Sequence, residues 1–67
     1  MDIRYSRHAR EQMIARGITE KEVSEGIQHG SKSMQKPDKI VSSHKYYSVV
    51  YKKKSGIIYV ITVKPRW

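Results

Sequence analysis

The chain has 67 residues, contains no cysteine and carries a formal net charge of +8. A domain of this size buries only roughly 60% of the surface that its unfolded chain exposes, so we expect a single domain over residues 1–67 with a thin core. The lack of cysteine excludes disulfides and thiolate metal sites and favours a reducing compartment. The N-terminus has no apolar export segment, and the longest apolar run, GIIYVI, is far shorter than the ~20 residues of a membrane span. We therefore expect a soluble, cytoplasmic protein.

The positive charge is concentrated in the second half of the chain. Residues 1–30 hold five Lys or Arg and five Asp or Glu, which cancel, whereas residues 31–67 hold nine Lys or Arg against Asp38 alone, 9 − 1 = +8. This asymmetry indicates a polyanion, an acidic protein or an acidic membrane surface as partner. A basic surface that serves only solubility has the same composition.

Two short helices are predicted in the first half. Ser6 is a suitable N-cap for a helix over residues 7–16, because its hydroxyl can accept an otherwise unpaired backbone N–H, and Gly17 suits the left-handed residue that ends such a helix.

The next residues, ITEKEV, have the pattern of a second helix start. Thr19 and Glu22 have the spacing of a capping box, and Ile18 and Val23 that of the hydrophobic staple around it. A helix is therefore expected from residue 20 to about residue 29, where Gly30 follows.

The second half predicts a small sheet. Residues 31–39 read as a polar loop with a turn at Pro37-Asp38, Ile40-Val41 begin a short strand, and residues 46–51 and 57–63 form a hairpin around KKKSG. The expected fold class is α+β, with two N-terminal helices packed on an antiparallel sheet of about three strands.

The register of the predicted hairpin decides which side chains face the helices. If Tyr51 lies opposite Ile57, the helices cover a face made of Tyr47, Val49, Tyr51, Ile57, Tyr59, Ile61 and Val63. The other face is then half apolar and half basic, and consists of Tyr46, Ser48, Val50, Lys52, Ile58, Val60, Thr62 and Lys64.

The order of several residues along the chain resembles a known family. The pattern comprises His8-Ala9, Met13, Arg16-Gly17-Ile18, Glu22-Val23 and the strand Val60-Ile61-Thr62-Val63. It resembles the domain family DUF4258, which is itself similar to the RelE/ParE toxin superfamily. That superfamily packs N-terminal helices on a small antiparallel sheet and includes ribosome-dependent and free ribonucleases. The resemblance covers nearly the whole chain and implies a minimal RelE/ParE-like fold.

The resemblance implies a metal-independent, cofactor-free RNA cleavage site. The recurrent polar residues of the family fall on His8, Arg16 and Thr62, and the sheet offers Tyr46 as a further candidate. In such a site an acid or base assists attack of the ribose 2′-hydroxyl on the phosphate while cations hold the developing charge. His8 suits proton transfer and Arg16 suits a phosphate clamp.

Each of these residues also has an ordinary structural explanation. His8 and Arg16 are two helical turns and about 80° apart, so they meet only if Arg16 reaches over the edge of the sheet. His8 also suits capping or packing, and Arg16 complements the helix dipole. His29 and His44 lie in or beside loops without a second His, Cys or carboxylate at metal-ligand spacing, so no metal site is expected.

Cations and one aromatic residue in the second half are candidates for nucleic-acid contact, namely Lys45, Lys52, Lys53, Lys54, Lys64, Arg66 and Trp67. Two classes of function follow. The first is an endoribonuclease toxin that acts on free or ribosome-bound RNA and is neutralised by an acidic antitoxin. The second is a non-catalytic module that binds nucleic acid or, in the ParE manner, a protein target. A carboxylate beside the site would favour the enzyme, and the sequence predicts none there.

Overall fold

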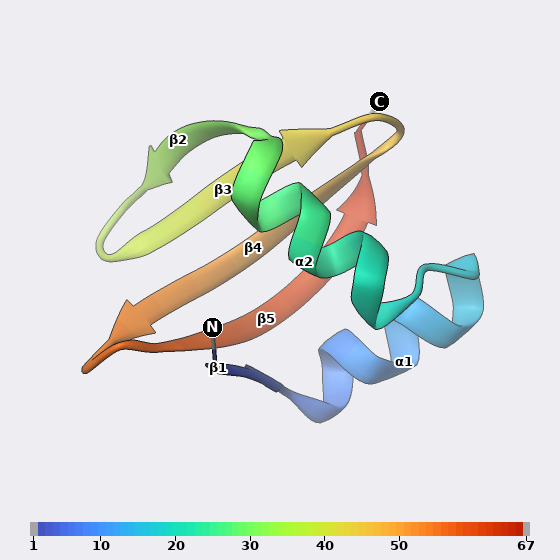
Figure 1. The fold of residues 1–67 in the computed structure, drawn as a ribbon, viewed down its shortest axis with the longest axis horizontal. Coiled ribbons are helices and arrows are strands. Elements are labelled where there is room, and N and C mark those ends of the chain that lie inside the picture. The colour runs from blue at the N-terminus through green and yellow to red at the C-terminus, as the bar shows by residue number, and fades with distance from the viewer. Residues whose placement is uncertain (1, 67) are drawn as a thin grey trace.

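The computed structural model describes residues 2–66 and has two layers, a twisted sheet with two helices on one face (Figure 1). The elements are β1 (Asp2–Tyr5), α1 (Arg7–Arg16), α2 (Glu20–His29), β2 (Ser31–Gln35), β3 (Lys39–His44), β4 (Tyr47–Lys54) and β5 (Ile57–Pro65). The α+β class and the two helices are confirmed.

The sheet differs from the expected one in size and direction. It has five strands in the order β1-β5-β4-β3-β2, and β1 runs parallel to β5 while all other neighbours are antiparallel. The prediction of about three antiparallel strands was therefore wrong. The strand β2 replaces most of the predicted loop, and it escaped prediction because SKSMQ is exposed along its whole length and has no alternation of apolar and polar residues.

The local signals at the helix ends are confirmed. The Ser6 hydroxyl accepts the backbone N–H of Ala9, and Gly17 ends α1 with φ 66°. In α2 the Thr19 hydroxyl accepts from the Glu22 backbone while the Glu22 carboxylate accepts from the Thr19 backbone. These contacts satisfy N–H groups that a helix start would otherwise leave without partners.

The register of the β4–β5 hairpin was predicted incorrectly. Its turn has two residues, Ser55 and Gly56, with φ 52° and 77°, as in the short turns that match strand twist. The lysines therefore lie within β4, and Tyr51 lies opposite Val60 instead of Ile57.

The pairing set by this turn decides the facing of β5 up to Val60, and a register shift at Val50/Tyr51 changes the alternation only beyond that residue. Ile58 and Val60 are buried in the core, whereas Tyr59 is 43% exposed. The prediction for these three side chains was thus reversed, because the observed pairing of Tyr51 differs from the predicted one by three residues, an odd number.

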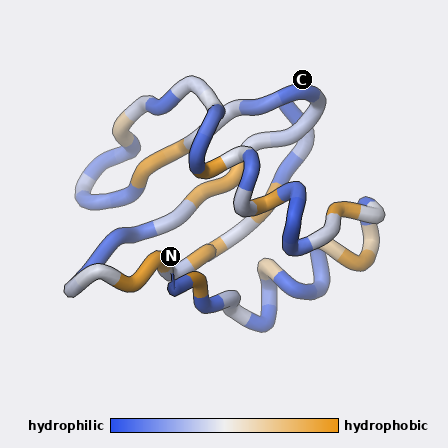
Figure 2. Tube along the Cα trace, in the orientation of Figure 1, coloured by the Kyte–Doolittle hydropathy of each residue, from blue (hydrophilic) through white to orange (hydrophobic). Residues whose placement is uncertain are grey.

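The core lies between the helices and the sheet. It consists of Ala9, Met13, Ile18, Val23, Ile27, Tyr47, Val49, Tyr51, Ile58, Val60 and Val63. Figure 2 shows the corresponding hydrophobic segments along β3, β4 and β5 and on the helices, separated by hydrophilic stretches. The predicted positions Tyr47, Val49, Tyr51 and Val63 are confirmed as core.

Candidate nucleic-acid interface

A groove of about 260 Å³ lies where the end of α1 meets the β3–β4 turn and the end of β5. It is lined by Ala15, Arg16, Ile18, Tyr46, Tyr47 and Pro65. Two of the four candidate catalytic residues, Arg16 and Tyr46, therefore lie in one concave site although they are far apart in sequence.

Arg16 is the last residue of α1 and is exposed. Its Nε donates a 3.1 Å hydrogen bond to Oε1 of Gln12, one turn earlier on the helix. This contact uses one of the five guanidinium donors, and among residues 2–66 the other four have no hydrogen-bond partner, so they suit an anion in the groove. A cation is also favourable here because the helix dipole is negative at this end.

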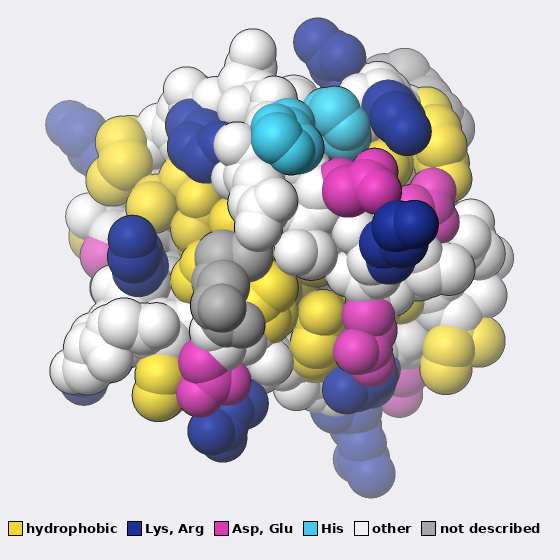
Figure 3. Space-filling model, in the orientation of Figure 1, with side chains coloured by type: hydrophobic (Ala, Val, Ile, Leu, Met, Phe, Trp, Pro, Cys, Tyr) yellow, Lys and Arg dark blue, Asp and Glu magenta, His cyan; other side chains and the backbone are white. Residues whose placement is uncertain are grey.

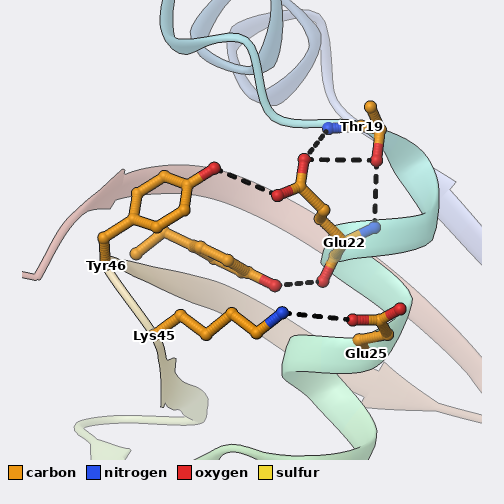
Figure 4. A network of polar contacts seen from close by, with 6 residues as sticks. Thr19, Glu22, Glu25, Lys45 and Tyr46 are labelled. Carbon is orange, nitrogen blue, oxygen red and sulfur yellow. Dashed lines mark hydrogen bonds and ion pairs between the residues drawn. The ribbon is translucent and has the colours of Figure 1, made fainter.

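Tyr46 lies in the β3–β4 turn, directly after Lys45, which has a φ of 54°. Its ring packs edge-on against the Tyr47 ring at a centroid distance of 5.2 Å, and the side chain is 47% exposed. The hydroxyl donates a 3.0 Å hydrogen bond to Oε2 of Glu22 (Figure 4). This hydrogen bond, followed by desolvation, raises the pKa of Tyr46, so the phenol is protonated at neutral pH.

Glu22 connects the start of α2 to the groove. Its Oε1 accepts the Thr19 backbone N–H at 3.0 Å while its Oε2 accepts the Tyr46 hydroxyl (Figure 4). The pKa of Glu22 is lowered, first by the Thr19 backbone hydrogen bond and then by Tyr46, with a smaller contribution from the charge on Lys45. The carboxylate is therefore ionised and both of its oxygens are occupied.

Tyr47 holds the β3–β4 turn against α2. The ring is fully buried, and its hydroxyl donates to the backbone carbonyl oxygen of Glu22. Burial, with the nearby charge of Glu22 next, raises the pKa of Tyr47 to about 12. The side chain is thus a neutral anchor that forms one wall of the groove.

Further cations border the groove. The backbone N–H of Arg66 donates to the Tyr46 carbonyl oxygen at 3.1 Å, and its Nη1 donates to the Lys45 carbonyl oxygen at 3.2 Å. The ammonium of Lys45 lies 3.9 Å from a carboxylate oxygen of Glu25. This pair is largely exposed and hence weak, so Lys45 can exchange Glu25 for another anion.

The other two candidate catalytic residues lie elsewhere. His8 is in the first turn of α1, about 12 Å from Arg16 along the helix axis at 1.5 Å per residue. Thr62 is opposite Val50 in the ladder, so it points to the face of the sheet that the helices do not cover. The structure brings together Arg16 and Tyr46 but joins neither His8 nor Thr62 to them.

The remaining candidate cations are spread over the sheet. Lys52, Lys53 and Lys54 are exposed at the far end of β4, where Lys52 lies 3.4 Å from Asp38, and Lys64 is exposed near the end of β5. Trp67 lies outside the described residues. Lys45 and Arg66 are the candidate binding residues that the structure places beside the groove.

Sequence reasoning missed the carboxylate of this site. The capping box correctly placed Glu22 at the start of α2, but only the packing of the β3–β4 turn brings Tyr46 onto its second oxygen. No group of three or more His, Asp or Glu side chains within residues 2–66 is arranged to hold a metal ion. No helix in that range is long and apolar enough to cross a membrane.

The fold and the groove define a small basic α+β domain with an arginine and a tyrosine in one anion-compatible site. Residues 5–65 match the family described as a domain of unknown function, DUF4258, and the chain belongs to this family. Searches among curated proteins and among solved structures gave no match.

Proposed function

We propose that this protein is a small toxin-like protein that acts on RNA, with the groove as the site where a phosphate binds. One observation carries the proposal: Arg16 and Tyr46, both proposed as site residues from the sequence, line the same groove. The excess charge of +8 supports RNA as the target, and so does the resemblance to RelE/ParE toxins that we infer from the sequence pattern.

The proposed reaction is metal-independent cleavage of RelE type. The ribose 2′-oxygen attacks the adjacent phosphorus, the bond from phosphorus to the 5′-oxygen breaks, and the products are a 2′,3′-cyclic phosphate and a free 5′-hydroxyl. Arg16 holds the phosphate charge in this scheme, because a guanidinium can donate to two phosphate oxygens. Tyr46 donates a proton to the leaving 5′-oxygen, and the 2′-hydroxyl proton passes to water.

A second candidate is a non-catalytic module that binds nucleic acid or a protein target. It is favoured by the state of Glu22, whose two oxygens already accept hydrogen bonds and whose pKa is lowered. Such a carboxylate is a weak base, and none of the described residues that line the groove is a stronger acceptor for the 2′-hydroxyl proton.

One experiment separates the two candidates. Purified protein is incubated with end-labelled RNA in the presence of EDTA, with and without ribosomes, and the ends of any fragments are identified. If the chain is an enzyme, we expect 2′,3′-cyclic phosphate ends, and a loss of roughly 100-fold in rate for Arg16→Ala and for Tyr46→Phe.

The control variant is His8→Ala, which changes an exposed residue at the other end of α1 and is expected to alter the rate less than twofold. RNA that remains intact in every setting, while salt-sensitive binding depends on Arg16, contradicts cleavage and supports the binding module. RNA that is neither cut nor bound contradicts cleavage and nucleic-acid binding, and leaves a protein target as the ligand of the module.

A further inference from the structure

Tyr59 is an exposed aromatic residue with a cationic side chain on each neighbouring strand. In the ladder it lies opposite Arg4 of β1 on one side and opposite Lys52 of β4 on the other. The Tyr59 side chain is 43% exposed. Residues that are directly opposite in a sheet point to the same face, so these three side chains form a row across three strands.

This row lies on the face of the sheet that carries no helix. The sequence neighbours of Tyr59, Ile58 and Val60, are buried in the core, and Tyr51, the neighbour of Lys52, is buried there too. Since successive side chains along a strand alternate, Tyr59 and Lys52 point away from the helices. Ser48 and Val50, farther along β4, are buried, and Tyr59 is the exposed aromatic side chain at the end of this face near the β4–β5 turn, while Lys64 is exposed at the other end.

Charge is divided unequally between the two sides of the sheet. All four glutamates lie in α1 or α2, and Figure 3 shows carboxylates interleaved with cations on the helix-bearing side. Alternation in the strands places Arg4, Lys52, Lys54 and Lys64 on the opposite face, where the described carboxylates are Asp2 and Asp38. Their ion pairs, Arg4–Asp2 at 3.2 Å and Lys52–Asp38 at 3.4 Å, are both exposed, so a phosphate can replace either carboxylate.

We propose that this face is a platform for single-stranded RNA, in which an unpaired base stacks on the Tyr59 ring while Arg4 and Lys52 contact the flanking phosphates. A flat aromatic ring between two cations matches the alternation of base and phosphate in a single strand. A duplex keeps its bases stacked on each other, and an acidic protein segment gains nothing specific from the exposed ring.

The platform proposal rests on the proposed function, which supplies RNA as the ligand. It deepens that function by naming the form of RNA that is bound, a single strand. Strand β5 connects the two sites: Pro65, in the wall of the groove, is six residues beyond Tyr59, about 20 Å at 3.3 Å per residue. Lys64 is exposed between them. Pro65 lies opposite Tyr47 and so on the helix-bearing side, and a single strand that occupies both sites therefore passes around the end of β5 from one face of the sheet to the other.

The test is binding of the full chain to a fluorescent single-stranded oligouridine and to a duplex RNA of equal length, measured by anisotropy at several salt concentrations. Tyr59→Thr is expected to weaken single-strand binding roughly tenfold, whereas Tyr59→Phe, which keeps the ring, is expected to bind within twofold of wild type. Threonine suits an exposed strand position, and circular dichroism checks that both variants fold.

Two lysine variants with the same charge change provide a matched control. Lys54→Gln, on the platform side, should reduce the salt slope of binding by about one, and Lys21→Gln, on α2, should not. Equal effects of the two lysines, or tight binding by Tyr59→Thr, would overturn the platform. Polyglutamate serves as a probe for an acidic protein segment. The platform would also be overturned if polyglutamate displaced the RNA equally well from wild type and from Tyr59→Thr.

The outcomes also distinguish the platform from the proposed function. If RNA stays uncut but its binding depends on Tyr59, the result supports the platform and contradicts the proposed cleavage. Cleavage that depends on Arg16 but proceeds equally well in Tyr59→Thr supports the groove and overturns the platform.

Discussion

The hydroxyl of Tyr46 is hydrogen-bonded to Glu22, 24 residues earlier in the chain, through the carboxylate oxygen that the capping box leaves free. One side chain thus begins helix α2 and orients an exposed ring of the groove. Substitutions at Glu22 are therefore expected to affect both the stability of the helix and the position of Tyr46.

The linkage between Glu22 and stability is testable by pH. The pKa of Glu22 is lowered from an ordinary value of 4.5, so its contribution to the free energy of unfolding is present above pH 4.5 and is lost as the pH falls through the folded pKa. We expect Glu22→Gln to lower the melting temperature at pH 6 to 7, and the gap to wild type to narrow as the pH falls below 4.5. Thermal melts from pH 2 to 7 measure this gap.

Glu11→Gln provides the comparison for that experiment, since Glu11 is an exposed glutamate of α1 outside the capping box. A gap between wild type and Glu22→Gln that stays constant down to pH 2 would show that charge on Glu22 has no part in stability.

The N-cap of α2 has a predictable energetic value. Thr19→Ala removes the hydroxyl that accepts the Glu22 backbone N–H at 3.1 Å, and loss of an N-cap side chain costs about 1 kcal/mol. Thr19→Ser keeps the acceptor and is expected to cost less than half of that. Urea unfolding of the three proteins measures the difference, and equal midpoints for Thr19→Ala and wild type would contradict the capping role.

Tyr47 links the turn to the helix and is expected to titrate late. Tyr47→Phe removes the hydroxyl that donates to the Glu22 carbonyl oxygen and should destabilise the protein by about 1 kcal/mol at neutral pH. Because the folded pKa is raised from 10.0 to about 12, the associated stability is present below pH 10 and is lost as the pH rises toward 12.

The measurement for Tyr47 is the absorbance of tyrosinate during an alkaline titration. Wild type should show one tyrosine that ionises near pH 12 and is absent from the titration of Tyr47→Phe. Identical late portions of the two curves would assign that ionisation to another residue.

Gly30 is expected to tolerate no side chain, for a steric reason. A Cβ at this position would collide with Oγ of Ser42 and lie 2.5 Å from the Gly26 carbonyl oxygen and 2.8 Å from that of Ser43. Gly30→Ala should therefore destabilise the protein by about 1–3 kcal/mol or more through overpacking, as measured by chemical unfolding.

Gly56 provides the contrast, because the backbone conformation at this position restricts which residue fits, whereas space for a side chain is not restricted. It has a φ of 77° and nothing within 4 Å of an added Cβ. Asparagine adopts positive φ more readily than other residues, so Gly56→Asn should cost much less than Gly30→Asn. Similar costs at both positions would indicate that close approach does not determine the effect at Gly30.

The local signals in the first half of the sequence predicted both helices and their ends. Ser6, Gly17 and the Thr19–Glu22 box act through hydrogen bonds within a few residues, so their pattern is visible in sequence. The number and pairing of strands were not visible in this way. β1 and β2 are short edge strands whose partners are chosen by the rest of the sheet, and β2 has no buried face to impose a pattern.

The hairpin illustrates the same limit at one position. The two-residue turn at Ser55-Gly56 pairs Lys52 with Tyr59 and so decides that Tyr59 points away from the helices, whereas a five-residue connection predicted the reverse. The period of two along a strand makes the facing of every side chain depend on a single residue of register.

The sequence by itself determined the charge imbalance, the two capped helices and the family, because composition and local hydrogen bonds do not depend on distant contacts. Only the tertiary structure decided that Arg16 and Tyr46 line the same groove while His8 and Thr62 lie elsewhere, and that Glu22 accepts the hydrogen bond of the Tyr46 hydroxyl. These relationships join residues 30 and 24 positions apart, and they depend on how the helices dock and where each strand pairs, which no local pattern specifies.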